Sequence, residues 1–488
     1  MDALLIIALL VPWALASAVA AVARPYRPWI GWLNALCGVV SAGAAMGLWA
    51  LALSGAPAVL GPDRVLRVDT LSALVATCVA LVTGIAMALG PGMTAADMDD
   101  PAACRKFRAY GSLFALAMLV AVTVNNVALM WVAIEATTIT SALLVPLHRT
   151  KASVEASWKY LLIGSVGIAL AFAGTVLAYF DFVALTGRRQ DALDWALLMQ
   201  VAPTLDPGLL RLAFVFLLVG YGTKAGLAPM HTWLPDAHSE APAPLSAMMS
   251  GVLLAVAQYA ILRWKSVVDL AAGGAAFTNQ ILLALGLLSI LIGALSLVRQ
   301  QSYKRLLAYS SVEHSGLICM GLTFGPAGVF ASLLHLVNHS LAKSTSFLLS
   351  GRILKRYGTT DVDKVSGLMR TMPATGTLFA AGVFALMGLP PFGLFVSEFL
   401  LFRAGFVSGH IWETSVAMVL VGIGFVALAA HLLRMLYGQA PDGVARGERE
   451  RWALAPLVAC AIALVVLGLL VPTVVTALLA NIVRAMPT

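Results

Sequence analysis

Three ionisable side chains stand inside long apolar stretches of this sequence, and they are the residues most able to do chemistry. Glu135 lies in LMWVAIEATTITSALL, Lys224 in LVGYGTKAGLAPM, and Glu398 in GLPPFGLFVSEFLLF. An ionised side chain at mid-bilayer costs about 2.5–3.5 kcal/mol on insertion scales. Each could be a packed residue that a neighbour neutralises, or one that reaches an interface. Several ionisable residues at such positions in one chain favour a proton path instead. The opposite charges of Glu135 and Lys224 could compensate each other while the two residues exchange a proton.

A fourth polar group is a row of three residues in LLHLVNHSLAKSTSFLL, namely His335, His339 and Lys343. Their i, i+4, i+8 spacing places all three on one helix face, where they form a polar stripe. Two histidines at i, i+4 can also bind a metal ion, but no carboxylate or thiol lies beside them in the sequence. We therefore expect proton transfer here, with neither catalytic nor metal-binding residues in the chain.

Prolines interrupt two of the apolar stretches close to these ionisable groups. Pro229 follows Lys224, and the pair Pro390–Pro391 precedes Glu398. Interrupted spans in corresponding places of two halves indicate an inverted-repeat transporter whose path lies near mid-membrane. Backbone carbonyls freed by the breaks must face protein or water, because lipid cannot hydrogen-bond them. We expect a hydrated, charged path at these breaks.

The composition shows what kind of chain has to position these groups. Of the 488 residues, 60% are hydrophobic and 11% are charged, and the mean hydropathy is +0.92. A soluble domain is nearer 45–50% apolar and about 25% charged, so a soluble enzyme, a secreted disulfide scaffold and a disordered protein are excluded. The sequence predicts an all-α polytopic membrane protein of about fourteen helices, each roughly 20 residues long. The predicted spans are 3–23, 30–54, 70–90, 109–125, 127–147, 158–180, 209–228, 243–262, 279–298, 306–322, 327–350, 374–395, 412–433 and 453–478.

Basic residues are distributed unevenly between alternate loops. Odd-numbered loops contain 19 Lys and Arg residues, whereas even-numbered loops and the C-terminal end contain 9 when Arg211, at the start of the seventh span, is counted with them. Because cytoplasmic loops are the richer in Lys and Arg, we expect both termini on the periplasmic side of a bacterial inner membrane. Basic cytoplasmic loops also explain the net charge of +8 without a nucleic-acid partner.

The cysteines stand singly and form no C-x-x-C pair; they are Cys37, Cys78, Cys104, Cys319 and Cys460. Iron–sulfur and zinc sites need clustered thiolates, and the sequence contains no glycine-rich nucleotide-binding motif. We therefore expect no redox centre and no cofactor in this chain. Whether it counts as an enzyme depends on the complex to which it belongs.

Four motifs give the sequence a family resemblance. GTKAGLAPMHTWLPDAHSEAPAPLSAMMSGVLL (222–254) resembles the signature of the antiporter-like membrane subunits of complex I, cation/proton antiporters and membrane-bound hydrogenases. Further similar stretches are KRLLAYSSVEHSGLICMGL (304–322), HLVNHSLAKSTSFLLSG (335–351) and GLPPFGLFVSEF (388–399). The resemblance covers most of 70–440, and its first motif is highly specific.

This resemblance implies fourteen helices, with two inverted five-helix repeats formed by spans four to eight and nine to thirteen. The seventh and twelfth helices would be broken, and the chain would divide into four segments: 1–108, 109–265, 279–438 and 452–488. The family's fifth-helix glutamate, seventh-helix lysine, eleventh-helix stripe and twelfth-helix ionisable residue take part in proton translocation. Their counterparts in this sequence are Glu135, Lys224, His335, His339, Lys343 and Glu398.

One position departs from the family pattern. Many members carry Lys or His in the eighth span, where this chain has Ala255, with Gln258 one turn further along. A continuous proton path then needs water, Gln258, or His231 and His238 in place of the missing side chain. We count Gln258 among the proton-translocation residues, because an amide can both donate and accept hydrogen bonds.

Three features favour the hydrogenase branch of this family. SSVEH (310–314) resembles hydrogenase-4-type and formate-hydrogenlyase membrane subunits, KASVEASWKYLLIGSVGIALAFAG (151–174) resembles hydrogenase-4 component F, and the eighth-span lysine is missing. The resemblance thus implies a proton-translocating subunit of a [NiFe] hydrogenase complex. Its Ni-Fe and iron–sulfur clusters would lie in partner subunits, among them soluble hydrogenase-type subunits on the cytoplasmic side and other membrane subunits. A complex I subunit, a Na⁺/H⁺ antiporter subunit, an inorganic-carbon uptake subunit and a spacer without transport are the alternatives.

Overall fold

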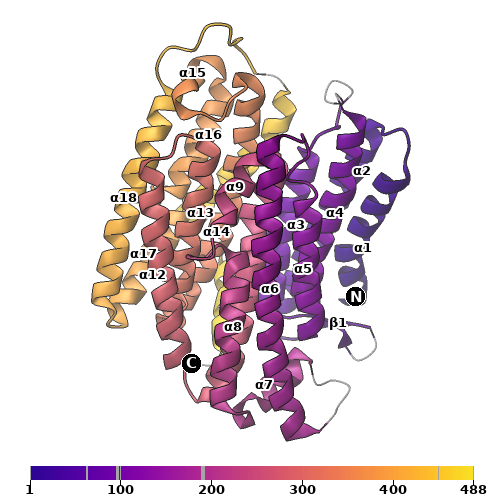
Figure 1. Ribbon diagram of the computed structural model, residues 1–488, viewed down its shortest axis with the longest axis vertical. Coiled ribbons are helices and arrows are strands. Elements are labelled where there is room, and N and C mark those ends of the chain that lie inside the picture. Colours follow the sequence, from indigo (N-terminus) through magenta and orange to yellow (C-terminus); the bar gives the residue numbers. More distant parts are fainter. Residues whose placement is uncertain are drawn as a thin grey trace. The chain divides into compact units, whose positions relative to one another are not determined.

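The computed structural model describes residues 2–61, 64–94, 98, 100–187, 193–448 and 450–486. Arg188, Arg189 and Arg449, which entered the loop count, lie outside these residues. The described chain is mostly helical, and it includes one short antiparallel hairpin, β1 (Ala58–Leu60) with β2 (Leu66–Val68). The α-helices, labelled in Figure 1, are α1 (Asp2–Val22), α2 (Pro28–Ala52), α3 (Thr70–Ala88), α4 (Pro101–Thr123), α5 (Val127–Ala142), α6 (Lys151–Thr186), α7 (Trp195–Val201), α8 (Pro207–Ala225), α9 (Trp233–Glu240), α10 (Ala243–Met248), α11 (Leu254–Ala272), α12 (Ala276–Val298), α13 (Tyr303–Gly321), α14 (Gly325–Tyr357), α15 (Leu368–Thr371), α16 (Pro373–Leu386), α17 (Gly393–Val407), α18 (Ile411–Leu436), α19 (Ala455–Leu469) and α20 (Thr473–Ala485).

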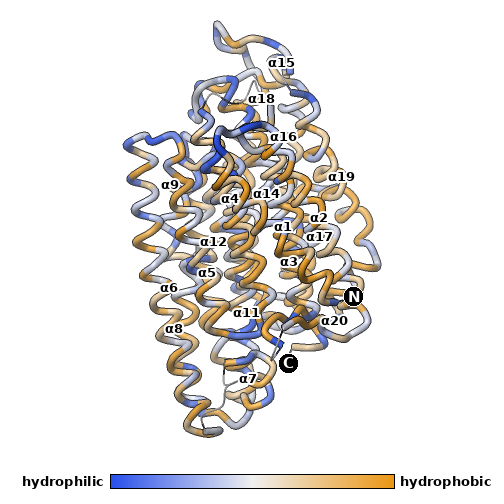
Figure 2. The backbone as a smooth tube through the Cα atoms, turned by 90° about the vertical axis from the view of Figure 1, so that its right-hand side faces the viewer, coloured by the Kyte–Doolittle hydropathy of each residue, from blue (hydrophilic) through white to orange (hydrophobic). Residues whose placement is uncertain are grey.

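The predicted polytopic, all-α architecture is confirmed. Each of the fourteen predicted spans falls on a helix or on two consecutive helices. Ten helices in the described part of the chain are long and apolar enough to cross a membrane alone, and shorter apolar helices accompany them. Figure 2 shows the apolar colour running along the helices, with hydrophilic segments most frequent in the connections. The division into segments 1–108, 109–265, 279–438 and 452–488 stays a prediction.

Polar side chains at the helix starts explain where several helices begin. The side chain of Asp100 accepts hydrogen bonds from the first N–H groups of α4, and that of Asn126 does the same for α5. Thr150 and Ser153 form a reciprocal capping box at the start of α6. These side chains satisfy N–H groups that have no partner within the helix. They therefore position α5 and α6, which carry part of the candidate site.

Packing divides the chain into two compact units. The first comprises residues up to Gly226, Val252–Leu282 and the stretch from Ala477; the second comprises Leu227–Gly251 and Leu283–Thr476. In the first unit, α6 and α8 run side by side and form its most extensive helix pair (Figure 1). A side chain at Gly220 of α8 would overlap the backbone of Gly167 in α6, so these glycines permit close approach. The end of α8 is thereby held against α6.

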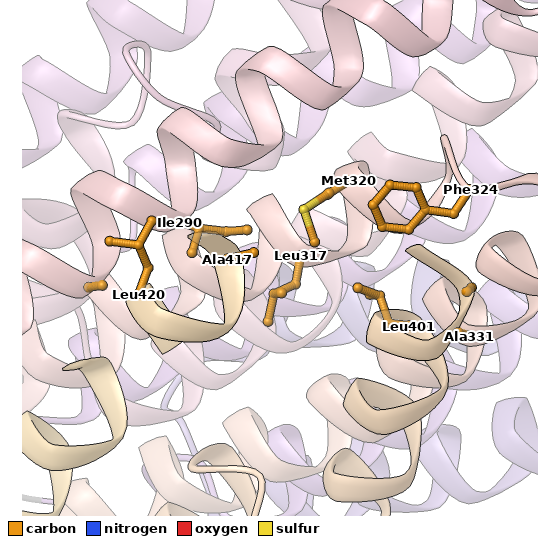
Figure 3. Packing of buried hydrophobic residues seen from close by; sticks show 10 residues of the cluster. Ile290, Leu317, Met320, Phe324, Ala331, Leu401, Ala417 and Leu420 are labelled. Atoms are coloured by element: carbon orange, nitrogen blue, oxygen red, sulfur yellow. The ribbon is translucent and has the colours of Figure 1, made fainter. Parts of the chain in front are cut away.

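In the second unit, an apolar core joins five helices. Figure 3 shows Ile290 of α12, Leu317 of α13, Ala331 of α14, Leu401 of α17 and Leu420 of α18 packed together. All five side chains are buried. Because this core joins α13, α14 and α17, polar residues a turn away on those helices are brought to the same place.

The two predicted helix breaks are confirmed. Helix α8 ends at Ala225, Gly226 takes the left-handed conformation with φ of +72°, and α9 begins only at Trp233. The twelfth helix is split into α16, ending at Leu386, and α17, beginning at Gly393. The Ala228–Pro229 and Pro390–Pro391 peptide bonds at these breaks are cis.

The bounds of several predicted spans differ from the structure, and two of these differences concern the candidate site. The twelfth was predicted to end at 395, but α17 continues to Val407 because the sequence stays apolar beyond Glu398. Glu398 therefore lies inside a helix. The eighth span is longer than predicted: α10, a π-helical turn at Met249–Leu253 and α11 form one continuous apolar stretch from Ala243 to Ala272. Single π-turns are frequent near functional sites.

Candidate functional site

The first cluster of predicted residues lies in the first unit, between α5, α6 and α8. Glu135 on α5 accepts a hydrogen bond from Thr138 Oγ1 through Oε2, at 2.9 Å. Its other oxygen, Oε1, accepts a hydrogen bond from Ser165 Oγ on α6, also at 2.9 Å. The carboxylate is therefore held by two hydroxyl groups from two helices, and hydrogen bonds of this kind to an ionised acceptor are strong.

Lys224 on α8 is completely buried and donates a hydrogen bond from Nζ to Thr138 Oγ1. The Thr138 hydroxyl thus accepts from the lysine and donates to the carboxylate of Glu135. No direct ion pair joins Lys224 to Glu135 in the described structure. The predicted pairing of the two charges is therefore mediated by one hydroxyl group, which gives a proton an uninterrupted hydrogen-bonded route between them.

Two residues of α6 shape the space around the lysine. The ring centroid of Tyr160 lies 4.9 Å from Lys224 Nζ, a cation–π arrangement, and the Tyr160 hydroxyl is 2.8 Å from Ser141 Oγ. A Cβ atom at Gly164 would lie 3.1 Å from both Lys224 Nζ and Thr138 Cγ2. Gly164 therefore leaves room for the lysine to reach Thr138.

The second cluster lies in the second unit, where α13, α14 and α17 meet. His335 of α14 lies between two partners: its Nε2 is 3.0 Å from His314 Nδ1 on α13, and its Nδ1 is 3.0 Å from Ser397 Oγ on α17. Glu398 Oε1 is 3.9 Å from His314 Nδ1. All four residues are buried, with at most 7% of any of them exposed.

The break in the twelfth helix makes room for Glu398. Gly388, with φ of +64°, lies so close to the Glu398 carboxylate that a Cβ atom there would overlap it. A positive φ is also a conformation that favours glycine. The Gly388-Leu389-Pro390-Pro391 sequence therefore both ends α16 and opens space beside the ionisable group.

The rest of the α14 stripe extends from His335 toward the helix C-terminus. The ring centroid of His339 lies 5.2 Å from that of His314, and His339 Nε2 is buried without a hydrogen-bond partner among the described residues. Lys343 is fully buried and donates from Nζ to Ser310 Oγ and to the Leu307 carbonyl of α13, the latter at 2.7 Å. The structure thus places His335, His339 and Lys343 along α13, and joins the first of them to α17.

Gln258 is separate from both of these hydrogen-bonded clusters. It lies on α11 in the first unit, is 4% exposed, and follows Ala255 by one turn, just beyond the π-helical turn. His231 and His238 belong to the second unit, where His238 is fully buried against Phe347 with a ring-centroid separation of 5.4 Å. Neither ring nitrogen of His238 has a hydrogen-bond partner among the described residues.

The sequence analysis missed the groups that connect the predicted residues. These are Thr138, Ser165, Ser310, His314 and Ser397. His314 could have been found, because it is another histidine in an apolar helix and carries the same signal as His335. The sequence analysis used His314 only as the last residue of the SSVEH motif.

Comparison with known proteins identifies a family and relatives. Residues 124–424 match the family described as NADH:quinone oxidoreductase/Mrp antiporter, transmembrane region. The chain is 41% identical over 350 residues to a hydrogenase-4 component F homolog of Methylacidiphilum infernorum, covering 72% of each chain. It is 33% identical over 284 residues to an NAD(P)H-quinone oxidoreductase chain 4 of Nostoc sp., covering 57% of this chain. That match spans about half, 49%, of the Nostoc protein.

A solved structure shares the whole fold. A chain of the membrane-bound sulfane sulfur reductase, an archaeal respiratory membrane complex, superposes with a TM-score of 0.87 and 23% sequence identity. The superposition covers 99% of this chain and 97% of the other. At that identity the likeness shows the fold alone.

Proposed function

Because the chain belongs to the NADH:quinone oxidoreductase/Mrp antiporter membrane family, we propose that it is a proton-translocating subunit of a hydrogenase-4-type complex. It would couple electron transfer in partner subunits to proton movement within its own helices. The observation that carries the proposal is the hydrogen-bonded series from Lys224 through Thr138 to Glu135. Charged groups inside a membrane protein are energetically costly and therefore rare, and where they occur they usually mark such a path.

The geometry supports a specific proton transfer in the first unit. The Lys224 ammonium gives a proton to Thr138 Oγ1 as the Thr138 hydroxyl gives its own proton to Glu135 Oε2. The result is a neutral amine, an intact hydroxyl and a carboxylic acid, so atoms and charge balance. Each proton moves along a hydrogen bond already present, which is the requirement for general acid–base transfer.

In the second unit, the candidate carriers are His314, His335 and Glu398. The two ring nitrogens that face each other are 3.0 Å apart, and the Glu398 carboxylate is next to them. An imidazole that gains a proton on one nitrogen can lose one from the other, so rings in series can transfer protons. His339 and Lys343 extend the polar stripe along α14, and Gln258 is the proposed water-holding residue on α11.

The relatives favour a hydrogenase-type complex over a quinone oxidoreductase. Identity to the hydrogenase-4 component F homolog is 41% over 350 residues, against 33% over 284 residues for the Nostoc quinone oxidoreductase chain. We place the Ni-Fe and iron–sulfur clusters in partner subunits, with the soluble partners on the cytoplasmic side. The 19-to-9 distribution of basic residues supports the proposal that both termini lie on the periplasmic side of the inner membrane.

A complex I-type subunit is the second candidate, because the family description and the Nostoc relative both name quinone oxidoreductases. A tag on this chain, used to purify the intact complex, distinguishes the two by the soluble subunits that accompany it. A nickel-containing large subunit would support the hydrogenase assignment. A flavin-containing NADH module would support the complex I assignment and overturn the first.

Proton translocation itself is tested with the purified complex in sealed vesicles. Its electron donor is added, and acidification of the lumen is followed with a pH-sensitive dye. The wild type is expected to pump, and a Lys224→Ala variant that assembles equally well is expected not to. Normal pumping by the variant would remove Lys224 from the proposed path.

A further inference from the structure

A groove of about 960 Å³ lies in the first unit, outside the proposed proton path. Its walls come from the end of α1, the first half of α4 and the segment that joins α5 to α6. The path residues Glu135, Lys224 and Gln258 do not line it. Pockets that bind small molecules measure about 300–1,000 Å³, so the groove has room for a ligand of that kind.

Cationic side chains dominate the polar wall of this groove. There are four of them: Arg24 after α1, Arg105 and Lys106 in the first turns of α4, and Arg149 before α6. The carboxylate of Asp100 also lines the groove, but it accepts the N–H groups of Ala102 and Ala103 at 2.9 and 3.0 Å. No carboxylate among the described residues forms an ion pair with any of the four cations. Three segments of the chain thus bring excess positive charge to one place.

These positive charges are close enough to act on one another. Lys106 on α4 and Arg149 before α6 repel each other, although 43 residues separate them in the sequence. An anion between two such cations replaces repulsion with attraction. A phosphate group suits guanidinium and ammonium groups especially well, because its oxygens accept several charge-assisted hydrogen bonds at once.

The backbone of Arg149 indicates that its side chain has a purpose in the groove. Its φ is +29°, a left-handed conformation that is uncommon for residues other than glycine. Glycine would make the same turn without steric cost. The turn alone therefore does not explain an arginine here, whereas a ligand for its guanidinium group does.

The groove continues from these cations to the exposed apolar surface of two predicted spans. Its wall includes Leu113 of α4, which is 37% exposed, and Ser17 of α1, which donates to the Ala109 carbonyl at 2.9 Å. Beyond Ser17, the α1 side chains of Leu15 and Val11 are 58% and 42% exposed. Both helices are long and apolar enough to cross a membrane. A ligand with a charged end and apolar chains therefore matches both parts of the groove.

We propose that this groove binds an anionic phospholipid, with the phosphate among Arg105, Lys106 and Arg149 and the acyl chains along α1 and α4. Basic pockets between transmembrane helices on the cytoplasmic side bind such headgroups. The loops that form this pocket are odd-numbered, the set predicted to be cytoplasmic. A soluble phosphate compound would use the cations but leave Leu113 and the exposed side of α1 without a partner.

A phosphate bound in this way would also steady the proton path. It would join the segment before α6 to the start of α4, and that segment connects α5, which carries Glu135, to α6, which carries Ser165. The inference itself does not rest on proton translocation, because it is defined by the charges and the exposed apolar side chains of the groove.

The experiment uses two photoreactive phospholipids in vesicles that contain the intact complex, purified through a tag on this chain. Both probes carry a diazirine in one acyl chain. One has the anionic phosphatidylglycerol headgroup, and the other has the zwitterionic phosphatidylcholine headgroup. After illumination, labelled peptides are identified by mass spectrometry. The anionic probe should label the peptides that contain Ser17 and Leu113 several-fold more than the zwitterionic probe does.

The double variant Lys106→Gln with Arg149→Gly removes two cations and gives the turn before α6 a residue suited to its conformation. Labelling by the anionic probe should fall at least about tenfold, because each basic residue near the membrane surface adds to the attraction. The matched control is Lys364→Gln with Arg434→Gln, which removes two exposed basic residues of the second unit and should label like the wild type.

A charge-conserving double variant, Lys106→Arg with Arg149→Lys, covers the possibility that loss of the cations disturbs folding; it should keep the labelling of the wild type. Equal labelling by both probes, unchanged labelling in the first variant, or no labelling in the wild type because a neighbouring subunit covers the groove would overturn the inference. Displacement of the probe by aqueous glycerol phosphate would also overturn it and assign the groove to a soluble phosphate compound. None of these measurements follows proton movement, so their failure is distinct from failure of the proposed function.

Discussion

Lys224 and Glu135 lie one hydroxyl group apart. The lysine donates to Thr138 Oγ1, and the same hydroxyl donates to the Glu135 carboxylate at 2.9 Å. Because the two charges are linked rather than in direct contact, the proton has a defined route between them. Replacing either end should stop proton transfer while the close packing of α6 against α8 at Gly167 and Gly220 remains.

The first prediction concerns the two ends of this series. Lys224→Ala or Glu135→Ala should lower proton pumping by about 100-fold or more, because a missing acid or base typically has an effect of that size. Assembly should be unchanged, since the α6–α8 contact depends on glycines such as Gly220. The measurement is acidification in vesicles, with Lys159→Ala as control; that lysine pairs with Glu155 on an exposed surface. Pumping at the wild-type rate by both site variants would contradict the assignment.

The second prediction isolates the hydroxyl of Thr138 from its packing. Thr138→Val keeps the shape but removes the group that both accepts from Lys224 and donates to Glu135, so pumping should fall strongly. Leaving the lysine without its acceptor should also destabilise the protein by about 1–3 kcal/mol. Thr138→Ser restores the hydroxyl and should restore pumping. If the valine and serine variants pump equally, the hydroxyl is not part of the route.

The ionisable residues of the proposed path could be picked out from the sequence, whereas the hydroxyl groups that connect them could not. An isolated charge in an apolar stretch is conspicuous, whereas hydroxyl residues are common in membrane helices and usually bond to their own backbone. Thr137 and Thr140 donate to carbonyls of α5, while Thr138 between them donates to Glu135. Nothing in the local sequence distinguishes the three.

The cluster in the second unit shows the same limit for contacts distant in sequence. His314 and His335 are 21 residues apart on different helices, and Ser397 is 62 residues beyond His335. The helix breaks could be predicted because proline and glycine act locally. Which side chains then meet depends on how α13, α14 and α17 pack, and that packing is set by apolar residues such as Leu317 and Leu401.

A third prediction tests the orientation of the chain. Arg352 is an unsuitable labelling site, because its side chain is engaged by Thr375 and Glu448, so Lys355→Cys on the exposed side of α14 is preferable. The basic-residue distribution predicts that Lys355→Cys lies in the cytoplasm and Arg64→Cys in the periplasm. Background labelling should be low, because the five native cysteines are buried. Labelling of Lys355→Cys by an impermeant external reagent would show that the orientation is the reverse of the predicted one.

A fourth prediction concerns stability and pH at Asp69. Its side chain caps α3 through Ser72 N–H and lies 2.6 Å from Arg263. Burial alone would raise the pKa of Asp69, but the charge and hydrogen bond of Arg263 outweigh it and lower the pKa below 3.8. The ionised form thus contributes stability above pH 3.8, and this contribution is lost as the pH falls through the lowered value.

Asp69→Asn should therefore lower the melting temperature at neutral pH, by an amount equivalent to about 1–3 kcal/mol. The difference from the wild type should shrink in acid, once Asp69 is protonated. Glu155→Gln is the control, because that carboxylate is largely exposed and pairs only along its own helix surface. Thermal unfolding of the detergent-solubilised protein at neutral and acid pH measures both effects. A difference that stays constant with pH would show that the charge of Asp69 does not contribute.

The fifth prediction separates a proton-translocating subunit from a spacer. If protons pass along α11, water held by Gln258 has to replace the basic side chain that Ala255 lacks. Gln258→Leu should then remove the water held at this position and slow pumping. The substitution should have little effect on folding, because the surrounding stretch is apolar and buried. Ala255→Lys should leave pumping intact or raise it, and Glu398→Gln should reduce it.

Vesicle acidification by the whole complex is the measurement, with the wild type pumping in the same preparation. Unchanged pumping in all three variants would place the proton route in another subunit and assign this chain a structural role.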